Sequence, residues 1–245
     1  MLSILVTGAS GRMGQTIQEA VDANPDTLVG ATHDAGQDLK AALSKTECAI
    51  DFTVHNFTDE VVETAVELGK PLVIGTTGHT EEQREKIRKA AEQIPIVYAP
   101  NYSIGVNTLF WLTRKAAEIL GNERCDIEVT EMHHKHKIDA PSGTARRLLE
   151  ILNEATDTDY DEDIEHGRVG NVGPRTQGKI GMHTLRGGDV VGDHTVMFAA
   201  DGERVELTHK ASSRMTFAAG AVKAAVWLKD KKSGLYDMQD VLGLV

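Results

Sequence analysis

Aromatic residues are scarce in this chain, since Phe, Trp and Tyr together make up 4% of its 245 residues. The hydrophobic share is nevertheless 40%, so any core must be built from Ala, Val, Ile and Leu. No run of about 18 apolar residues occurs, so no transmembrane helix is implied. The first eight residues lack the basic flank and the long apolar run of a signal peptide, and they predict a buried strand instead.

Cysteine and positive charge are also in short supply. The two cysteines, Cys48 and Cys125, lie far apart and have no metal-ligand spacing, which is typical of reduced thiols in a cytoplasmic protein. Lys and Arg number 26 against 37 Asp and Glu, and the formal net charge is -11. This balance argues against nucleic acid or an anionic membrane as the main partner, because both select basic surfaces.

Short apolar runs alternate with helical patterns over the first hundred residues. The sequence predicts strands at residues 2–6, 28–32, 49–52, 71–74 and 96–98. Helical spacing falls between them, at residues 13–23, 39–43, 57–68 and 81–93. Strand and helix in alternation predict an α/β fold of the Rossmann type, with a parallel sheet covered by helices on both faces.

The pattern changes after Pro100. We expect a helix at 106–120 that ends at Gly121, a strand at 126–132 and a helix at 142–152. Residues 157–178 are acidic, glycine-rich and aperiodic, and they predict a long loop. Three hairpin-like strands follow, so the second region should hold an antiparallel or mixed sheet; the strands are expected at 180–186, 190–199 and 204–210. A helix at 216–229 and a packed apolar tail at 235–242 complete the chain.

A glycine-rich turn separates the first expected strand from the first expected helix. Its sequence is Gly8-Ala9-Ser10-Gly11-Arg12-Met13-Gly14, with glycine at every third position. Glycines there allow a pyrophosphate to approach backbone N–H groups at a helix N-terminus, so this βαβ context predicts a dinucleotide site.

An acidic residue follows the second expected strand, at Asp34, where it would bind the adenosine ribose hydroxyls. Ala35 rather than Arg follows it, which favours NADH over NADPH because a 2′-phosphate would face a carboxylate. Arg12 could still pair with that phosphate, so we expect a preference and not exclusion.

Two further polar loops follow strand ends, Gly75-Thr76-Thr77 and Ala99-Pro100-Asn101-Tyr102. Ligands of open parallel sheets lie at the carboxyl ends of the strands, so these loops are expected to line the nicotinamide site. Ordinary turns are the alternative interpretation of both loops.

Five potential cations stand side by side in this acidic protein: His133, His134, Lys135, His136 and Lys137. Ser142-Gly143-Thr144 then begins a helix, and a helix N-terminus with hydroxyl groups binds carboxylate or phosphate. Histidine transfers protons near neutral pH. The segment therefore predicts a small anionic substrate held beside acid–base groups.

Three other interpretations of this segment stay open. It could be a solvated basic loop, or Ser142 could act only as a helix cap. A metal site with His134 and His136 as ligands is the third, although no cysteine or suitably spaced carboxylate supports it, and we expect no metal.

At these residues the sequence resembles the bacterial 4-hydroxy-tetrahydrodipicolinate reductases (dihydrodipicolinate reductases) of lysine biosynthesis. The similarity runs in order through the whole chain, and the block from Glu131 to Ala145 is its most specific part. The remaining matching segments are residues 8–14, Ile50-Asp-Phe-Thr53, 73–78, 101–107 and 210–217.

The resemblance implies a fold and an activity. A dinucleotide-binding Rossmann domain would comprise residues 1–104 and 214–245, and residues 105–213 would form a substrate-binding and tetramerisation domain. Hydride would pass from NADH, or less favourably NADPH, to a cyclic conjugated imine dicarboxylate, with loss of water and formation of tetrahydrodipicolinate. A homotetramer is expected, and the strand-rich region 180–210 offers edges that need covering.

The resemblance also implies roles for single residues. His133 matches the proton donor, and Lys137 matches a second proton donor whose charge would also hold substrate. His134 matches a substrate contact, while Gly143 and Thr144 match the carboxylate-binding pair. Residues 8–13, Asp34, 75–77 and 99–102 match the cofactor contacts.

Some positions depart from the family pattern. Ala35 stands where some members have Arg, Met132 replaces the commoner Ala, and Tyr102 replaces the commoner Phe. The short stretch between Asp34 and Cys48 leaves the adenine side of the site undefined. A reductase of another small dicarboxylate or amino acid, and a nucleotide sensor without turnover, are the alternative functions.

Overall fold

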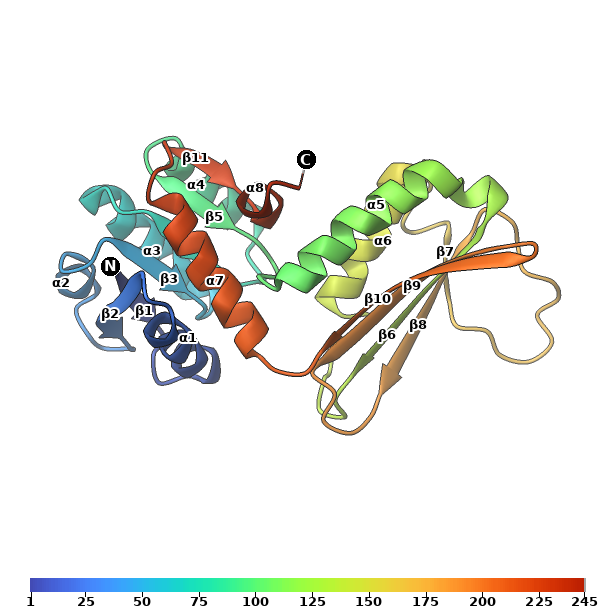
Figure 1. Ribbon diagram of the computed structural model, residues 1–245, viewed down its shortest axis with the longest axis horizontal. Helices are drawn as coiled ribbons and strands as arrows, with labels where there is room; N and C mark the ends of the chain where they lie inside the picture. The colour runs from blue at the N-terminus through green and yellow to red at the C-terminus, as the bar shows by residue number, and fades with distance from the viewer. Residues whose placement is uncertain (245) are drawn as a thin grey trace. The chain divides into compact units, whose positions relative to one another are not determined.

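The structure is a computed structural model that describes residues 1–244 (Figure 1). The chain forms two compact units, one of residues 1–104 with 214–245 and one of residues 105–213. We call them the first and the second unit and describe each by itself.

A six-stranded sheet forms the centre of the first unit. Its order is β11-β5-β4-β3-β1-β2, and every neighbouring pair is parallel. The α/β class and the parallel sheet are therefore confirmed. The strands are β1 (Leu2–Thr7), β2 (Thr27–His33), β3 (Cys48–Asp51), β4 (Leu72–Ile74), β5 (Pro95–Tyr98) and β11 (Gly234–Tyr236).

Helices cover both faces of this sheet, because alternate strand residues point to opposite sides. Ile4 and Val6 of β1 enter a core with α1 and α7, whereas Leu5 between them enters a core with α2, α3 and α4. The helices are α1 (Arg12–Ala23), α2 (Leu39–Leu43), α3 (His55–Leu68), α4 (Glu81–Ala91), α7 (Met215–Leu228) and α8 (Met238–Leu242).

The apolar tail packs as expected, and it also extends the sheet. Leu235 of β11 pairs with Ile96 of β5, and Met238 and Val241 of α8 are buried beside α7. Figure 1 shows β11, drawn in red, beside the green β5, and α7 against the sheet.

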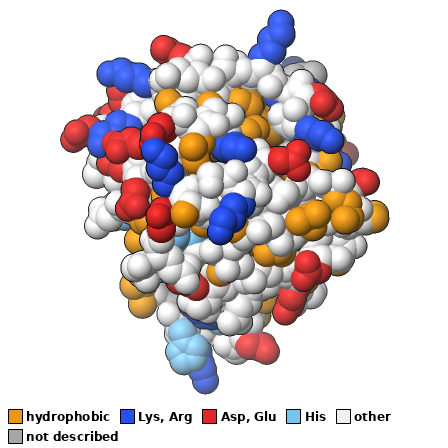
Figure 2. Space-filling model, turned by 90° about the vertical axis from the view of Figure 1, so that its left-hand side faces the viewer, with side chains coloured by type: hydrophobic (Ala, Val, Ile, Leu, Met, Phe, Trp, Pro, Cys, Tyr) orange, Lys and Arg blue, Asp and Glu red, His pale blue; other side chains and the backbone are white. Residues whose placement is uncertain are grey.

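The surface of the face in Figure 2 intersperses acidic with basic side chains. Ion pairs join acidic and basic side chains of the first unit, such as Lys86 with Asp59 and Arg88 with Glu81. Within residues 1–244, no helix combines the length and the apolar character that a membrane span requires.

The second unit holds a mixed five-stranded sheet of order β10-β9-β6-β8-β7. Its helices, α5 (Ile104–Arg124) and α6 (Gly143–Thr156), share a core with the strands, and Gly121 interrupts α5 where the sequence predicts its end. The strands are β6 (Asp126–His133), β7 (Ile164–His166), β8 (Ile180–Arg186), β9 (Gly192–Ala200) and β10 (Glu203–Ala211).

Two expectations about this unit are wrong. Only β9 and β10 form a hairpin, because β6 lies between β8 and β9 and pairs in parallel with β8. Loop length alone could not reveal this insertion of an earlier strand. The segment 157–178 is also not wholly irregular, since residues 164–166 form β7 at the sheet edge beside β8.

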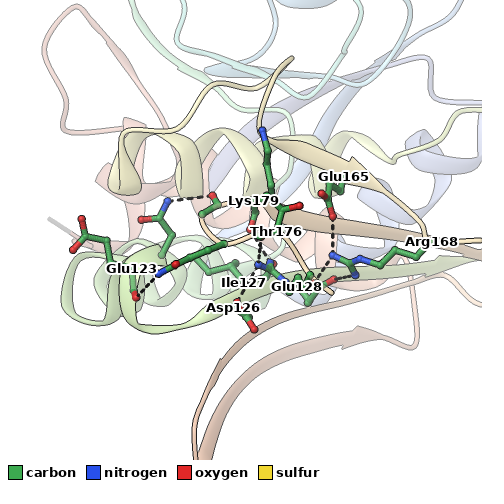
Figure 3. A network of polar contacts seen from close by, with 12 residues as sticks. Glu123, Asp126, Ile127, Glu128, Glu165, Arg168, Thr176 and Lys179 are labelled. Carbon is green, nitrogen blue, oxygen red and sulfur yellow. Dashed lines mark hydrogen bonds and ion pairs between the residues drawn. The ribbon is translucent and has the colours of Figure 1, made fainter. Parts of the chain in front are cut away.

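Glu128 on β6 anchors that segment through a network of charges (Figure 3). It accepts hydrogen bonds from Arg168 Nη2 at 3.0 Å and from Arg175 Nε at 2.9 Å, and it lies 2.6 Å from His183 Nε2. Burial alone would raise the pKa of Glu128, but these partners outweigh burial and lower it to about 2. The Glu128 carboxylate thus holds the segment 157–178 against β6.

Candidate active site

The glycine-rich turn brings α1 very close to β1. Gly8 has φ +60°, and the Gly11 N–H donates to its carbonyl at 2.9 Å. A Cβ atom on Gly14 would lie 2.1 Å from the same carbonyl, so only glycine fits there. No side chain caps α1 at Gly11, and its first turn holds no acidic residue. These features suit a helix start that receives an anionic phosphate group.

Asp34 lies against this turn. Its Oδ1 accepts hydrogen bonds from the Ser10 N–H at 3.1 Å and from the Ser10 hydroxyl at 2.9 Å. The Ala9 N–H also donates to the carbonyl of His33, which ends β2. The structure therefore brings Asp34 and the glycine-rich turn together.

A buried carboxylate that sequence reasoning missed joins the neighbouring strand ends. Asp51 ends β3, is 0% exposed and accepts hydrogen bonds from four threonine hydroxyls. The donors are Thr7 at 2.6 Å, Thr53 at 2.6 Å, Thr58 at 3.2 Å and Thr76 at 2.8 Å. The Thr76 hydroxyl is therefore already bound within the protein, and chiefly the backbone of Thr76 is available to a ligand.

The two other expected cofactor loops follow β4 and β5. The Gly75 N–H donates to the carbonyl of Asp51, and Ala99 is buried, whereas Thr77 and Pro100 are exposed. Tyr102 is 1% exposed, and its hydroxyl donates to the carbonyls of Ile74 and Val97 at 2.9 Å each. The buried Tyr102 side chain thus connects the carboxyl ends of β4 and β5.

Strand alternation places two groups of the second unit on one buried face. Glu131 and His133 are two residues apart on β6 and point to the same side. Strand pairing sets Arg186 of β8 opposite His133 and His194 of β9 opposite Glu131. Four ionisable side chains from three strands therefore meet at the end of this sheet.

Glu131 is the centre of this group and is 0% exposed. Its Oε2 lies 2.5 Å from His133 Nδ1 and accepts from Arg186 Nη1 at 2.9 Å. Its Oε1 accepts from Arg186 Nη2 at 2.9 Å and from the Ser142 N–H at 3.1 Å. Burial would raise the pKa of Glu131, but the partners outweigh burial and lower it to about 2, so the group is ionised.

Ser142 caps α6 and contacts His194. Its hydroxyl oxygen accepts from the Ala145 N–H at 3.2 Å and lies 3.1 Å from His194 Nε2. Burial, reinforced by the positive charge of His133, lowers the pKa of His194 to about 3. His194 is therefore neutral near pH 7 and can orient Ser142 without adding charge.

The remaining expected residues lie at the turn between β6 and α6. Lys137 is 21% exposed and its Nζ lies 2.9 Å from Asp139 Oδ1. The Lys137 N–H donates to the carbonyl of His134, whose ring lies 6.2 Å from that of His136. Gly143 is exposed and Thr144 half-buried at the first turn of α6. Residues 1–244 contain no group of three or more His, Cys, Asp or Glu that could hold a metal ion.

Sequence reasoning missed Arg186 and His194, and it did not give Glu131 a role. The spacing of Glu131 and His133 on an expected strand could have revealed their shared face. Arg186 and His194 are 55 and 63 residues beyond Glu131, and only the strand order brings them to it.

Two family models match the chain in sequence order. "Dihydrodipicolinate reductase, N-terminus" matches residues 2–102, and "Dihydrodipicolinate reductase, C-terminus" matches residues 105–242. The chain belongs to the dihydrodipicolinate reductase family. The resemblance found in the sequence is thereby confirmed.

Curated relatives of this family are similar over their whole length. A 4-hydroxy-tetrahydrodipicolinate reductase from Akkermansia muciniphila is 68% identical over 244 residues, covering 100% of this chain and 99% of the relative. One from Magnetococcus marinus is 46% identical over 265 residues, covering 99% of this chain and 98% of the relative.

Among solved structures, a dipicolinate-bound dihydrodipicolinate reductase from Paenisporosarcina sp. TG-14 shares the fold, with a TM-score of 0.81. It is 22% identical and the alignment covers 98% of each chain. A probable dehydrogenase from Thermotoga maritima has a TM-score of 0.59 at 10% identity, over 99% of this chain and 93% of the other. Both likenesses concern the fold alone.

Proposed function

We propose that this chain is a 4-hydroxy-tetrahydrodipicolinate reductase that acts in the diaminopimelate and lysine pathway. It would reduce its substrate with NADH or NADPH and release tetrahydrodipicolinate and water. The arrangement of His133 on Glu131, next to the helix start at Ser142, carries this proposal. It sets an acid–base group beside a carboxylate-binding element, as reduction of a cyclic imine dicarboxylate requires.

The nucleotide would bind along the carboxyl ends of the first unit's strands. The uncapped start of α1 suits its pyrophosphate, and Asp34 suits the adenosine ribose. The expected contacts are residues 8–13, Asp34, 75–77 and 99–102. The bound nicotinamide supplies the hydride.

The second unit's residues would handle the substrate and the proton. Hydride addition to a conjugated imine develops negative charge, and His133 Nε2 would protonate it while the Glu131 carboxylate stabilises the imidazolium. Lys137, as a second proton donor and charge, and His134 would contact the substrate. The N-terminus of α6, from Ser142 to Thr144, would hold a substrate carboxylate.

An absorbance assay tests the proposed activity. We expect oxidation of NADH that depends on 4-hydroxy-tetrahydrodipicolinate generated enzymatically in the cuvette, with tetrahydrodipicolinate as the product. Loss of NADH with another small dicarboxylate but not with this substrate would favour the alternative reductase. Cofactor binding without any turnover would favour a sensor.

Cofactor preference gives a second test. We propose that NADH is preferred, because the Asp34 carboxylate would face the 2′-phosphate of NADPH. Asp34→Ser should shift the ratio of kcat/KM values toward NADPH by about tenfold, or ~1.4 kcal/mol. Arg12→Ala, the control, should lower kcat/KM for NADPH alone. A wild-type enzyme that clearly prefers NADPH would contradict the assignment.

The assembly and the location of the protein remain proposals. We propose a homotetramer built through the sheet of the second unit, whose edge strands would otherwise stay uncovered. A cytoplasmic location agrees with two cysteines that are both buried and unpaired.

A further inference from the structure

We infer that Glu131 is a positioning residue of this site. Its carboxylate fixes the tautomer of His133 and links that histidine to Ser142, the N-cap residue of α6. This inference rests on the proposed function, in which His133 donates a proton to the substrate. It goes further by saying which ring nitrogen carries that proton and which residue decides it.

The hydrogen bonds around Glu131 determine the tautomer. Arg186 and the backbone N–H of Ser142 can only donate, so three of the four contacts require acceptor oxygens. An ionised carboxylate has no proton to give, so His133 must donate from Nδ1 across the 2.5 Å contact. In the neutral ring, Nε2 is then the nitrogen without hydrogen, ready to gain the proton that it transfers.

The surroundings of His133 agree with this division between its nitrogens. A Cβ atom on Gly192 would lie 3.0 Å from His133 Nε2, so a glycine at this position keeps the space beside that nitrogen open. His194 packs edge-on against the ring, with centroids 5.2 Å apart and planes at 75°. The ring is thus fixed at Nδ1, and a side chain at position 192 would crowd Nε2.

The same carboxylate connects both halves of the segment from Glu131 to Ala145. Its Oε2 holds the acid–base histidine, and its Oε1 holds the backbone of Ser142, whose side chain caps α6. Arg186 donates one hydrogen bond to each oxygen and so fixes the plane of the carboxylate. A change at Glu131 must therefore disturb both the orientation of His133 and the distance between His133 and the N-terminus of α6.

Glu131→Gln tests the inference through the ring nitrogens. Long-range ¹H–¹⁵N spectra of ¹⁵N-histidine-labelled protein, in alkaline buffer where imidazoles are neutral, report the tautomer. His133, assigned from its absence in His133→Ala, should be protonated at Nδ1 in the wild type and shift toward Nε2–H in the variant, whose amide can donate. With substrate, kcat should fall about 10²-fold or more, with little change in the KM for NADH.

Glu128→Gln is the matched control. Glu128 lies on the same strand, is likewise bound by arginine and histidine side chains and has a similarly lowered pKa, yet it points to the other face. It should leave the His133 tautomer unchanged and kcat within about threefold. The control separates loss of stability from loss of positioning.

Wild-type His133 protonated at Nε2, or a Glu131→Gln enzyme with unchanged tautomer and kcat, would overturn the inference. The wild-type spectrum decides the question even if the variant does not fold. Since this spectrum needs no substrate, an enzyme inactive on 4-hydroxy-tetrahydrodipicolinate but with the Nδ1–H tautomer would refute the proposed function alone.

Discussion

Replacing His133 or Lys137 by alanine should lower kcat by about 10²-fold or more, the usual effect of losing a positioned acid–base group. His133 supplies the proton in our account, and Lys137 adds charge and a second proton at the turn before α6. Because both side chains lie at a site rather than in the hydrophobic core, the variants should fold and still bind NADH. Steady-state kinetics with the generated substrate measures the effect.

Neighbouring residues provide controls for these two variants. Lys135 and His136 carry the same side-chain types and are exposed. Lys135→Ala and His136→Ala should keep kcat within about threefold of the wild type. If all four variants lose activity equally, the segment acts through its total charge, and if His133→Ala turns over normally, the assigned proton donor is wrong.

Acid should destabilise the second unit through His194. The unfolded chain binds a proton at the ordinary histidine pKa of 6.5, whereas the folded protein does not until about pH 3. Protonation therefore favours the unfolded state as the pH falls between these values. From pH 7 to pH 5, His194 should reduce the free energy of unfolding by about 2 kcal/mol. Below about pH 4.5, Glu131 and Glu128 lose their stabilising charge as well.

Trp111 lies on α5 in the second unit, so its fluorescence in a Trp227→Phe background can follow urea unfolding there. His194→Gln keeps a polar contact to Ser142 but cannot titrate. It should remove most of the loss of stability between pH 7 and pH 5. An equal loss in both proteins would show that His194 does not bind the extra proton on unfolding.

Local patterns predicted the first unit well. Alternating apolar runs and helical spacing identified β1 to β5 and the helices between them, because each element carries its own periodicity. The glycine at position 14 is also explained locally, by the contact of its backbone with Gly8. The strand β11 is as short as β4 but contains no buried residue, so no buried apolar run marks it, and only its pairing with β5 defines it.

The site of the second unit was predicted only in part, for the same reason. His133, Lys137 and Ser142 stand close together in sequence and could be read as one segment. Arg186 and His194 enter the site through the pairing of β8 and β9 with β6, which no local pattern specifies. The insertion of β6 between these two strands is the feature that the hairpin interpretation missed.

Deuterium-labelled NADH can follow the hydride that the proposed reduction transfers. NADH deuterated at both C4 positions should be incubated with the enzyme and 4-hydroxy-tetrahydrodipicolinate, and the product analysed by mass spectrometry. The substrate loses water, and we expect tetrahydrodipicolinate with one deuterium per molecule, formed about 10²-fold or more slowly by His133→Ala. Product without deuterium, or NADH that keeps both of its C4 deuterium atoms, would contradict reduction by this site.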